Sequence, residues 1–318
     1  MIKMKKTNLL RLLLLTCFFN YTQLSAQEGK EEPTFFTGLS PVILERNAAE
    51  INLLNSFNSY WIVSKQFNPD LPTGFQLDRK RFTRTEHILR ASYGFSKNKR
   101  WDLGVELKFA QARLDEAARS SPFLVFGTEK GTGTSYRGLS GIGLRLRTQP
   151  FNNIPELTVQ GTVLYPQRTT SSTENERAQL DAQSVQTGIS ATYYRQSGEN
   201  LYYFFQGDWS VRLKNQENKR TKHAPSLSTT LVFRTWEDRW FWFGGLNYGM
   251  SLQQFSNGGL YRLSQALFAS GGVFYQPTPK FSIVLSAQLP RLFESNLRSV
   301  ELVRESFTGF TLGMRSLL

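Results

Sequence analysis

Charged side chains recur two to four residues apart at several places in this 318-residue chain. Asp102, Glu106 and Lys108 lie in one stretch, and Arg145 and Arg147 lie in another. In an extended strand, even spacings place all of these side chains on one face. Opposite charges on that face could neutralise one another, whereas grouped arginines could attract an anion. Both hypotheses need strands that present this face.

Residues suited to catalysis are few. The chain has two histidines, His87 and His223. Thr85 and Leu89 lie two positions from His87, so no serine shares its face of a strand, and His223 ends the basic run 219–223. A hydrolase needs a nucleophile beside its base, so we expect that the chain is not an enzyme. No His, Asp and Glu residues have metal-ligand spacing, and neither a metal nor another cofactor is expected.

The first 26 residues have the organisation of a secretory signal peptide. Four basic residues precede an apolar run over 12–19, and small residues end at Ala26, so cleavage is expected before Gln27. The alternative, a membrane anchor, would need an apolar run of about 20 residues. Removal of four basic and no acidic residues lowers the net charge from +13 to +9. It also removes Cys17, the only cysteine, so the mature chain would have no disulfide and no thiolate site.

The stretch 101–114 shows what kind of element could position the charges. Its apolar side chains have one parity and its polar or small ones the other, a period that fits a strand between two environments and not a helix. Transmembrane strands need about 9–11 residues, whereas strands of globular proteins average about 5–6. The apolar set is Trp101, Leu103, Val105, Leu107 and Phe109, and the other set is Asp102, Gly104, Glu106, Lys108 and Ala110.

The same alternation predicts twelve strands along the chain. Their ranges are 49–61, 85–95, 101–114, 136–148, 156–165, 184–195, 201–213, 226–235, 240–252, 263–275, 281–289 and 306–318. Connections after odd-numbered strands are long and polar: 63–84, 115–135, 166–183, 214–225, 253–262 and 290–305. Connections after even-numbered strands are short: 96–99, 149–155, 196–200, 236–239 and 276–280. An even number of strands returns both termini to the side of the short turns.

Hydropathy and aromatic placement agree with strands in a membrane. No run of about 18 apolar residues follows the signal, so no transmembrane helix is predicted. The mean hydropathy of −0.36 would suggest a soluble protein, but membrane barrel strands are half polar. Rings near the strand ends fit interfacial girdles. Those near short turns are Trp101, Tyr193, Tyr203, Trp236, Trp240, Tyr275 and Phe281, and those near long connections are Tyr60, Trp61 and Tyr165.

With long connections on one side and short turns on the other, the mature chain resembles the Gram-negative outer-membrane β-barrels. Its size and N-terminal arm are similar to those of single-chain transporters of solutes or hydrophobic compounds. The C-terminus, Arg315–Leu318, is apolar rather than aromatic, which departs from the usual assembly signal of that class.

The resemblance implies an all-β fold, a transmembrane antiparallel up-and-down β-barrel of about twelve strands, within a range of about 10–14. The last strand must pair with the first, because backbone groups in hydrocarbon all need partners. Residues 1–26 would be the signal peptide, 27–47 a periplasmic arm or a plug, and 48–318 the barrel. The protein would lie in the outer membrane of a Gram-negative bacterium with both termini periplasmic. Implied partners are outer-membrane lipid, lipopolysaccharide and the barrel-assembly machinery.

In such a barrel the polar parity lines the lumen, mostly with Ser, Thr, Gly, Gln and Asn. One hypothesis is a structural network, with Glu106 paired to Lys108 or Asp208 paired to Arg212. The other is a transport path in which Arg145 and Arg147, with Arg234 at similar depth, filter anions. The charged residues assigned to the lumen are Arg90, Asp102, Glu106, Lys108, Arg145, Arg147, Asp208, Arg212 and Arg234.

The sequence therefore predicts a passive pore or transporter for small anionic or hydroxylated solutes. The alternatives are a non-conducting structural or accessory barrel of an envelope complex and a soluble exported β-protein. Nucleic acid is not an expected partner, because the basic residues are scattered rather than striped.

Two further motifs are predicted to lie in loops on the long-connection side. The glycine-rich stretch 127–133 lacks both the strand-then-helix context and the Lys-Ser/Thr ending of a phosphate loop, so a flexible extracellular loop is expected. The basic run Arg79–Arg81 would contact lipopolysaccharide phosphates or simply be solvated.

Overall fold

The computed structural model describes residues 43–67, 75–96, 100–115, 121–127, 134–167, 184–214, 220–235, 239–255, 258–288, 292–295 and 308–318. All of them belong to one compact unit, Thr34–Leu318. The predicted signal peptide, Cys17, the arm up to residue 42 and most of the glycine-rich stretch lie outside the described residues.

The described residues form thirteen strands and one short 3-10 helix. The strands are β1 (Ala49–Phe67), β2 (Phe75–Gly94), β3 (Trp101–Asp115), β4 (Thr134–Thr148), β5 (Leu157–Pro166), β6 (Gln186–Ser197), β7 (Leu201–Arg212), β8 (Lys222–Arg234), β9 (Trp240–Gln254), β10 (Leu260–Thr278), β11 (Phe281–Gln288), β12 (Leu292–Ser295) and β13 (Thr308–Leu317), and the helix is η1 (Pro122–Phe126). Within the described residues, no helix is long and apolar enough to cross a membrane.

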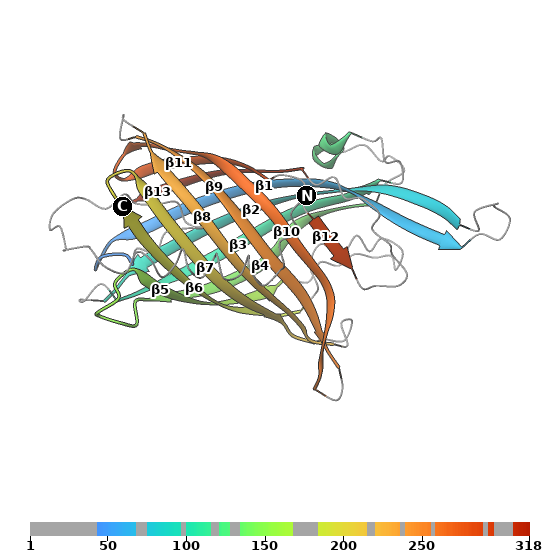
Figure 1. Ribbon diagram of the computed structural model, residues 1–318, viewed down its shortest axis with the longest axis horizontal. Coiled ribbons are helices and arrows are strands. Elements are labelled where there is room, and N and C mark those ends of the chain that lie inside the picture. The colour runs from blue at the N-terminus through green and yellow to red at the C-terminus, as the bar shows by residue number, and fades with distance from the viewer. Residues whose placement is uncertain are drawn as a thin grey trace, which may run out of the picture. The chain divides into compact units, whose positions relative to one another are not determined.

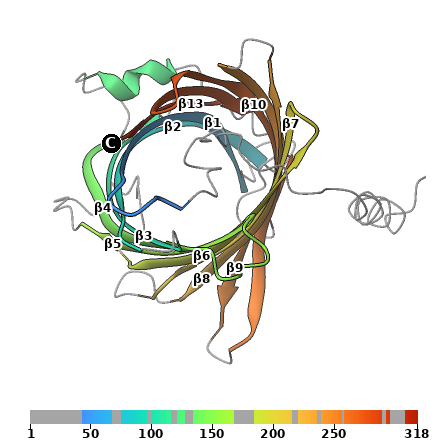
Figure 2. The same cartoon turned by 90° about the vertical axis from the view of Figure 1, so that its left-hand side faces the viewer.

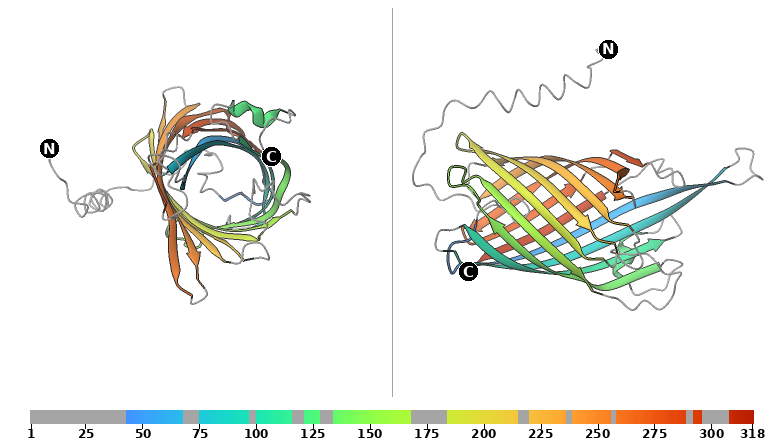
Figure 3. Two further views of the ribbon diagram at one scale, coloured as in Figure 1. Left: turned by 90° about the vertical axis from the view of Figure 1, so that its right-hand side faces the viewer. Right: turned by 90° about the horizontal axis from the view of Figure 1, so that it is seen from below.

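Twelve of the strands close into a barrel. Strands β1 to β11 pair antiparallel in chain order, β13 pairs with β11, and β13 pairs with β1 from Glu50–Leu317 to Ser59–Thr308. Figure 2 shows the resulting ring, and the right-hand view of Figure 3 shows the tilt of its strands. The predicted fold class, a closed antiparallel up-and-down barrel of about twelve strands, is confirmed.

The two ends of the barrel differ, as the connection lengths predicted. We call one end the turn end, because β2–β3, β4–β5, β6–β7, β8–β9 and β10–β11 are joined there by at most eight residues. The start of β1 and the C-terminus also lie at this end (Figure 1). We call the opposite end the loop end, and the connections between β3 and β4 and between β5 and β6 lie there.

Three details at the loop end differ from the prediction. Most of the predicted loop 63–84 is strand, because β1 and β2 pair up to Phe67–Phe75, so Arg79–Arg81 lies in β2 and not in a loop. Strands β9 and β10 also extend, which shortens the predicted loop 253–262 to five residues. Strand β12 pairs with β10 inside the predicted loop 290–305. Strands β1 and β2 project beyond the barrel as a ribbon (Figure 1). Such a ribbon needs no apolar face, so alternating hydropathy does not reveal these parts of the strands in the sequence.

Side chains on the two faces of the wall follow the predicted parity. On β3, Trp101, Leu103 and Val105 are exposed on the outside, and Asp102 and Gly104 are buried inside. Strand β4 repeats the pattern, with Leu144 and Leu146 exposed and Arg145 and Arg147 buried. At the turn end the rings of Trp240 and Tyr275 stack with centroids 4.3 Å apart. The outer surface is therefore an apolar band with aromatic groups at its edge, which suits hydrocarbon.

Candidate functional site

The strand register brings the predicted lumen charges into rows across the wall. One row runs through Asp102, Arg147, Gln160, Ser190 and Asp208, on five successive strands from β3 to β7. The next row towards the loop end runs through Glu50, Ser92, Gly104 and Arg145. A third contains Arg315, Asn52, Arg90 and Glu106. Residues far apart in sequence therefore meet on one inner surface.

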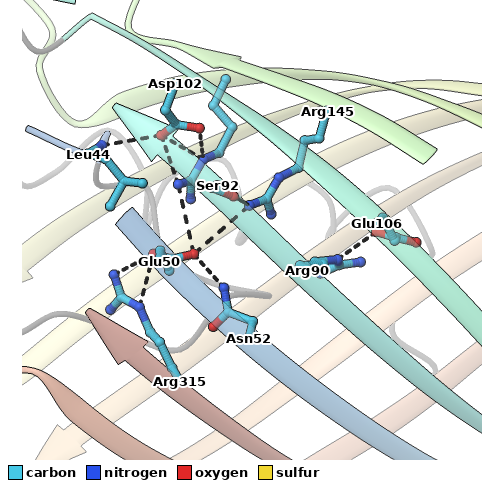
Figure 4. A network of polar contacts seen from close by, with 10 residues as sticks. Leu44, Glu50, Asn52, Arg90, Ser92, Asp102, Glu106, Arg145 and Arg315 are labelled. Carbon is cyan, nitrogen blue, oxygen red and sulfur yellow. Dashed lines mark hydrogen bonds and ion pairs between the residues drawn. The ribbon is translucent and has the colours of Figure 1, made fainter. Parts of the chain in front are cut away.

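Five charged side chains from these rows form what we call the charge cluster (Figure 4): Glu50, Asp102, Arg145, Arg147 and Arg315. Glu50 on β1 is completely buried, and its Oε2 accepts bonds from Nη2 and Nε of Arg315 at 2.7 and 3.0 Å. Asn52 Nδ2 donates to the other carboxylate oxygen, Oε1, at 2.5 Å. The first and last strands of the barrel are thus joined by a charge-assisted pair as well as by backbone bonds.

Asp102 on β3 binds Arg147 on β4 in a similar way. Arg147 Nε lies 2.8 Å from Asp102 Oδ1, and Arg147 Nη2 lies 2.8 Å from Asp102 Oδ2. Asp102 Oδ2 also accepts the backbone N–H of Leu44 at 3.2 Å. Both side chains are at most 2% exposed, so this pair holds Arg147 in the wall.

Arg145 has a different environment from Arg147. Its guanidinium donates to the Ser92 hydroxyl on β2, and its distance to Glu50 Oε1 is 3.9 Å. Gly104 lies between them in the register, and a Cβ there would be 2.7 Å from Ser92 Oγ and 3.4 Å from Arg145 Nε. The missing side chain at 104 therefore allows Arg145 to reach across β3.

A polar cavity of about 390 Å³ adjoins the charge cluster inside the barrel. The charged residues that line the side formed by β2–β4 are Arg90, Glu106, Lys108, Arg145 and Arg147. The side formed by β5–β7 carries hydroxyl and amide groups and one carboxylate. These residues are Thr158, Gln160, Thr162, Gln186, Ser190, Thr192, Gln206 and Asp208.

The ion pairs around the cavity differ from those predicted. Glu106 Oε2 accepts a bond from Arg90 Nε at 2.6 Å, and Lys108 Nζ lies 3.3 Å from Glu86 Oε1. Asp208 accepts bonds from Gln206 and Ser226, so the predicted pair of Asp208 with Arg212 is wrong. Spacing along one strand suggested partners within that strand, whereas the closest carboxylates belong to neighbouring strands.

Not every predicted lumen residue lies at this cavity. Arg212 pairs in the register with Lys222 near the loop end, and Arg234 lies at the turn end of β8. Neither lines the cavity, so Arg234 does not join Arg145 there. The sequence analysis missed Glu50, although it has the lumen parity of β1. The signal available in the sequence was a charged side chain at the lumen parity, directly before the apolar Ile51.

Part of the lumen is apolar, which the prediction of a polar lining did not anticipate. We call this region the aromatic cluster; its buried members are Tyr202, Phe204, Val232, Phe241, Phe274 and Val284, from β7 to β11 near the turn end. Leu54 of β1, on the charged side, packs against it. Phe241 and Phe274 meet edge to face at 5.3 Å. The runs 201–205 and 240–243 are apolar at both parities, which is the sequence signal for this cluster.

The residues before β1 lie against the inner wall at the turn end. Ile43 and Leu44 are both buried, and a Cβ on Gly94 of β2 would lie 2.7 Å from the Leu44 carbonyl oxygen. Asn47 adopts a φ of 67°, and its N–H donates to the Gly94 carbonyl at 2.8 Å. This turn reverses the chain from the inner wall into β1. We call residues 43–47 the entry segment.

Neither histidine has the neighbours of a catalytic base. His87 Nδ1 lies 2.7 Å from Asn55 Oδ1 on the outer face of β1 and β2. His223 Nδ1 accepts from the indole of Trp209 at 3.3 Å. In the described part of the chain, no group of three His, Cys, Asp or Glu residues could hold a metal ion.

Solved structures share the fold of this chain. An outer-membrane channel from Pseudomonas putida F1 has a TM-score of 0.59 and 13% identity, over 87% of this chain and 98% of the channel. The β-domain of the Bordetella autotransporter BrkA has a TM-score of 0.50 and 10% identity, over 84% of this chain and 99% of that domain. No protein-family model matches the chain. No curated protein matches it either. The fold is therefore that of outer-membrane β-barrels.

Proposed function

We propose that this protein is an outer-membrane channel that carries small polar solutes through its lumen. The observation that supports this most directly is the polar cavity inside the closed wall, because a purely structural barrel of this width could be filled by side chains. Thr, Ser, Gln and charged groups on the cavity surface replace the water around a polar solute. The outer-membrane location, with both termini periplasmic, is part of the same proposal.

The entry segment and the upstream arm would close the turn end of this channel. The charge cluster and the aromatic cluster both lie at that end, and Leu44 is bonded directly to the charge cluster. This proposal treats residues 27–47 as a plug rather than a free arm, since residues 43–47 run along the inner wall.

Conductance of the full-length protein in planar bilayers tests the proposal. We expect discrete current steps, with a reversal potential in a salt gradient that shows a preference for anions, because the charge cluster has more guanidinium groups than carboxylates. A C-terminal epitope that is reached only after the outer membrane is permeabilised would agree with periplasmic termini.

A second candidate function is a non-conducting accessory barrel of an envelope complex. It is favoured by one observation, the aromatic cluster, whose buried side chains occupy part of the inner wall near the turn end. Absence of current steps from both the native protein and a variant with a displaced entry segment would favour this alternative.

A further inference from the structure

We infer that the lumen cavity binds a small hydroxylated oxyanion, a carboxylate or a phosphate ester, through the guanidinium of Arg145. The inference rests on the proposed channel function and names the class of solute that its cavity would select. It depends on three observations: the charge balance of the cluster, the placement of Arg145, and the chemistry of the opposite wall.

The charge cluster contains three guanidinium groups and two carboxylates among the described residues. Arg315 is bonded to Glu50 at 2.7 Å, and Arg147 is bonded to Asp102 at 2.8 Å. Arg145 therefore shares Glu50 at 3.9 Å with a closer cation. Its side chain is 4% exposed, and a charge removed from water is stable only when it is paired and hydrogen-bonded. An anion in the adjoining cavity would supply the third negative charge.

The position of Arg145 leaves donors for such an anion. One Nη nitrogen donates to Ser92, and the side chain lines the cavity. A guanidinium has five N–H donors in a planar fork that matches carboxylate and phosphate oxygens. The bond to Ser92 holds this fork (Figure 4), and Gly104 leaves room for it, so the group is oriented before a ligand arrives.

The wall of the cavity opposite Arg145 determines which groups the ligand carries besides its anionic group. It presents three threonines, three glutamines and a serine, together with the single carboxylate of Asp208, which accepts hydrogen bonds from Gln206 and Ser226. Hydroxyl and amide groups both donate and accept hydrogen bonds, as the hydroxyls of a polyol or sugar do. None of the described residues that line this cavity is aromatic, so a flat apolar anion would find no stacking partner among them. The volume of about 390 Å³ is within the usual range of small-molecule sites, roughly 300–1,000 Å³.

Binding to the purified full-length protein in detergent, measured by titration calorimetry, tests this inference. The probes are glucuronate, glucose 6-phosphate and neutral glucose. We expect both anions to bind at least about tenfold more tightly than glucose, since a charge-assisted bond is worth more than a neutral one. Comparing the two anions shows which oxyanion is preferred. Inorganic phosphate should bind more weakly than glucose 6-phosphate if the hydroxyl wall contributes.

A matched pair of variants, Arg145→Met and Arg212→Met, tests whether the anion binds at Arg145. Arg145→Met should weaken glucuronate binding about tenfold or more, and Arg145→Lys should fall between, because lysine keeps the charge but lacks the fork. Arg212→Met removes the same charge from a lumen position outside the cavity and should change the affinity less than about twofold. Unchanged circular dichroism shows that each variant is folded. If Arg145→Met does not fold, Thr162→Val and Gln160→Met test the opposite wall.

The inference is overturned if glucuronate binds Arg145→Met as well as the native protein, or if glucose binds as tightly as glucuronate. Its failure differs from failure of the channel proposal. Current steps without selective anion binding would leave a channel that lacks this site. Selective anion binding without current would leave a binding protein that is not a channel.

Discussion

At the scale of single residues, the buried carboxylate of Glu50 at the turn end lies near more than one cation. Glu50 is bonded to Arg315 and lies 3.9 Å from both Arg145 and Arg147. Removing one member of a buried ion pair leaves an uncompensated charge, and this usually destabilises a protein more than the intact pair stabilises it.

Glu50→Gln should therefore lower the free energy of unfolding by about 3–5 kcal/mol, because Arg315 would stay buried beside an uncharged amide. The measurement is urea unfolding in lipid vesicles. Glu86→Gln is the control: Glu86 also binds cations but its side chain is 20% exposed, so a loss of about 1 kcal/mol or less is expected. Equal losses in the two variants would contradict the assigned role of burial.

Arg145 and Arg147 provide a second comparison, since they have the same residue type, strand and face. Arg147→Met should destabilise by about 3–5 kcal/mol because it leaves Asp102 without its cation. Arg145→Met removes the cation in excess, so stability should stay within about 1 kcal/mol of the native value in ligand-free buffer, or rise. The two variants are unfolded side by side. The opposite order would show that Arg145, and not Arg147, balances the cluster.

The sequence predicted the residues of the cluster better than their pairs. Asp102 and Arg147 could be placed on inner faces from parity alone, but parity does not give the register between strands. Glu50 and Arg315 were not among the predicted lumen residues, although closure of the barrel makes the first and last strands neighbours. Arg145 could not be told apart from Arg147, since the difference depends on Gly104 and Ser92 on two other strands.

At the scale of elements, the entry segment lies so close to β2 that position 94 cannot carry a side chain. A Cβ there would lie 2.7 Å from the Leu44 carbonyl oxygen, and backbone on both sides leaves little freedom to move. The position of the entry segment is thus linked to one glycine.

Gly94→Ala should displace the entry segment and increase the conductance of the channel, measured in planar bilayers. Gly161→Ala is the matched control, because a Cβ at 161 meets nothing within 4 Å. Conductance of Gly161→Ala should equal that of the native protein. Equal conductance of all three proteins would show that residues 43–47 do not limit the current.

Strand prediction succeeded where the wall touches two different environments. On β3 and β4, lipid lies on one side and the polar cavity on the other, so hydropathy alternates. The alternation of hydropathy gave less information for β7 and β9 near the turn end, where the aromatic cluster makes both faces apolar. It also failed for the outer parts of β1 and β2, where neither face needs to be apolar.

At the scale of the whole molecule, the outer surface is specified by a single physical requirement, contact with hydrocarbon. Val105 and Leu144 are paired neighbours on β3 and β4, and both are exposed on the outside. Ser190 lies on the inner face of β6 among polar side chains.

Val105→Arg should lower stability in vesicles by about 2–4 kcal/mol, the usual effect of arginine at the midplane of a barrel's lipid face. Ser190→Arg introduces the same side chain inside, where Asp208 is its register partner, and should change stability by less than about 1 kcal/mol. Unfolding curves of both variants in one lipid provide the measurement. A larger loss for Ser190→Arg would mean that the faces have been assigned the wrong way round.

The bond between Glu50 and Arg315 connects residues 265 positions apart. Strand β13 pairs with β11 on one side and with β1 on the other, so without it the sheet would have two open edges, and open edges are prone to pair with other chains. A product that stops short of residue 308 would be left without the strand that joins β11 to β1.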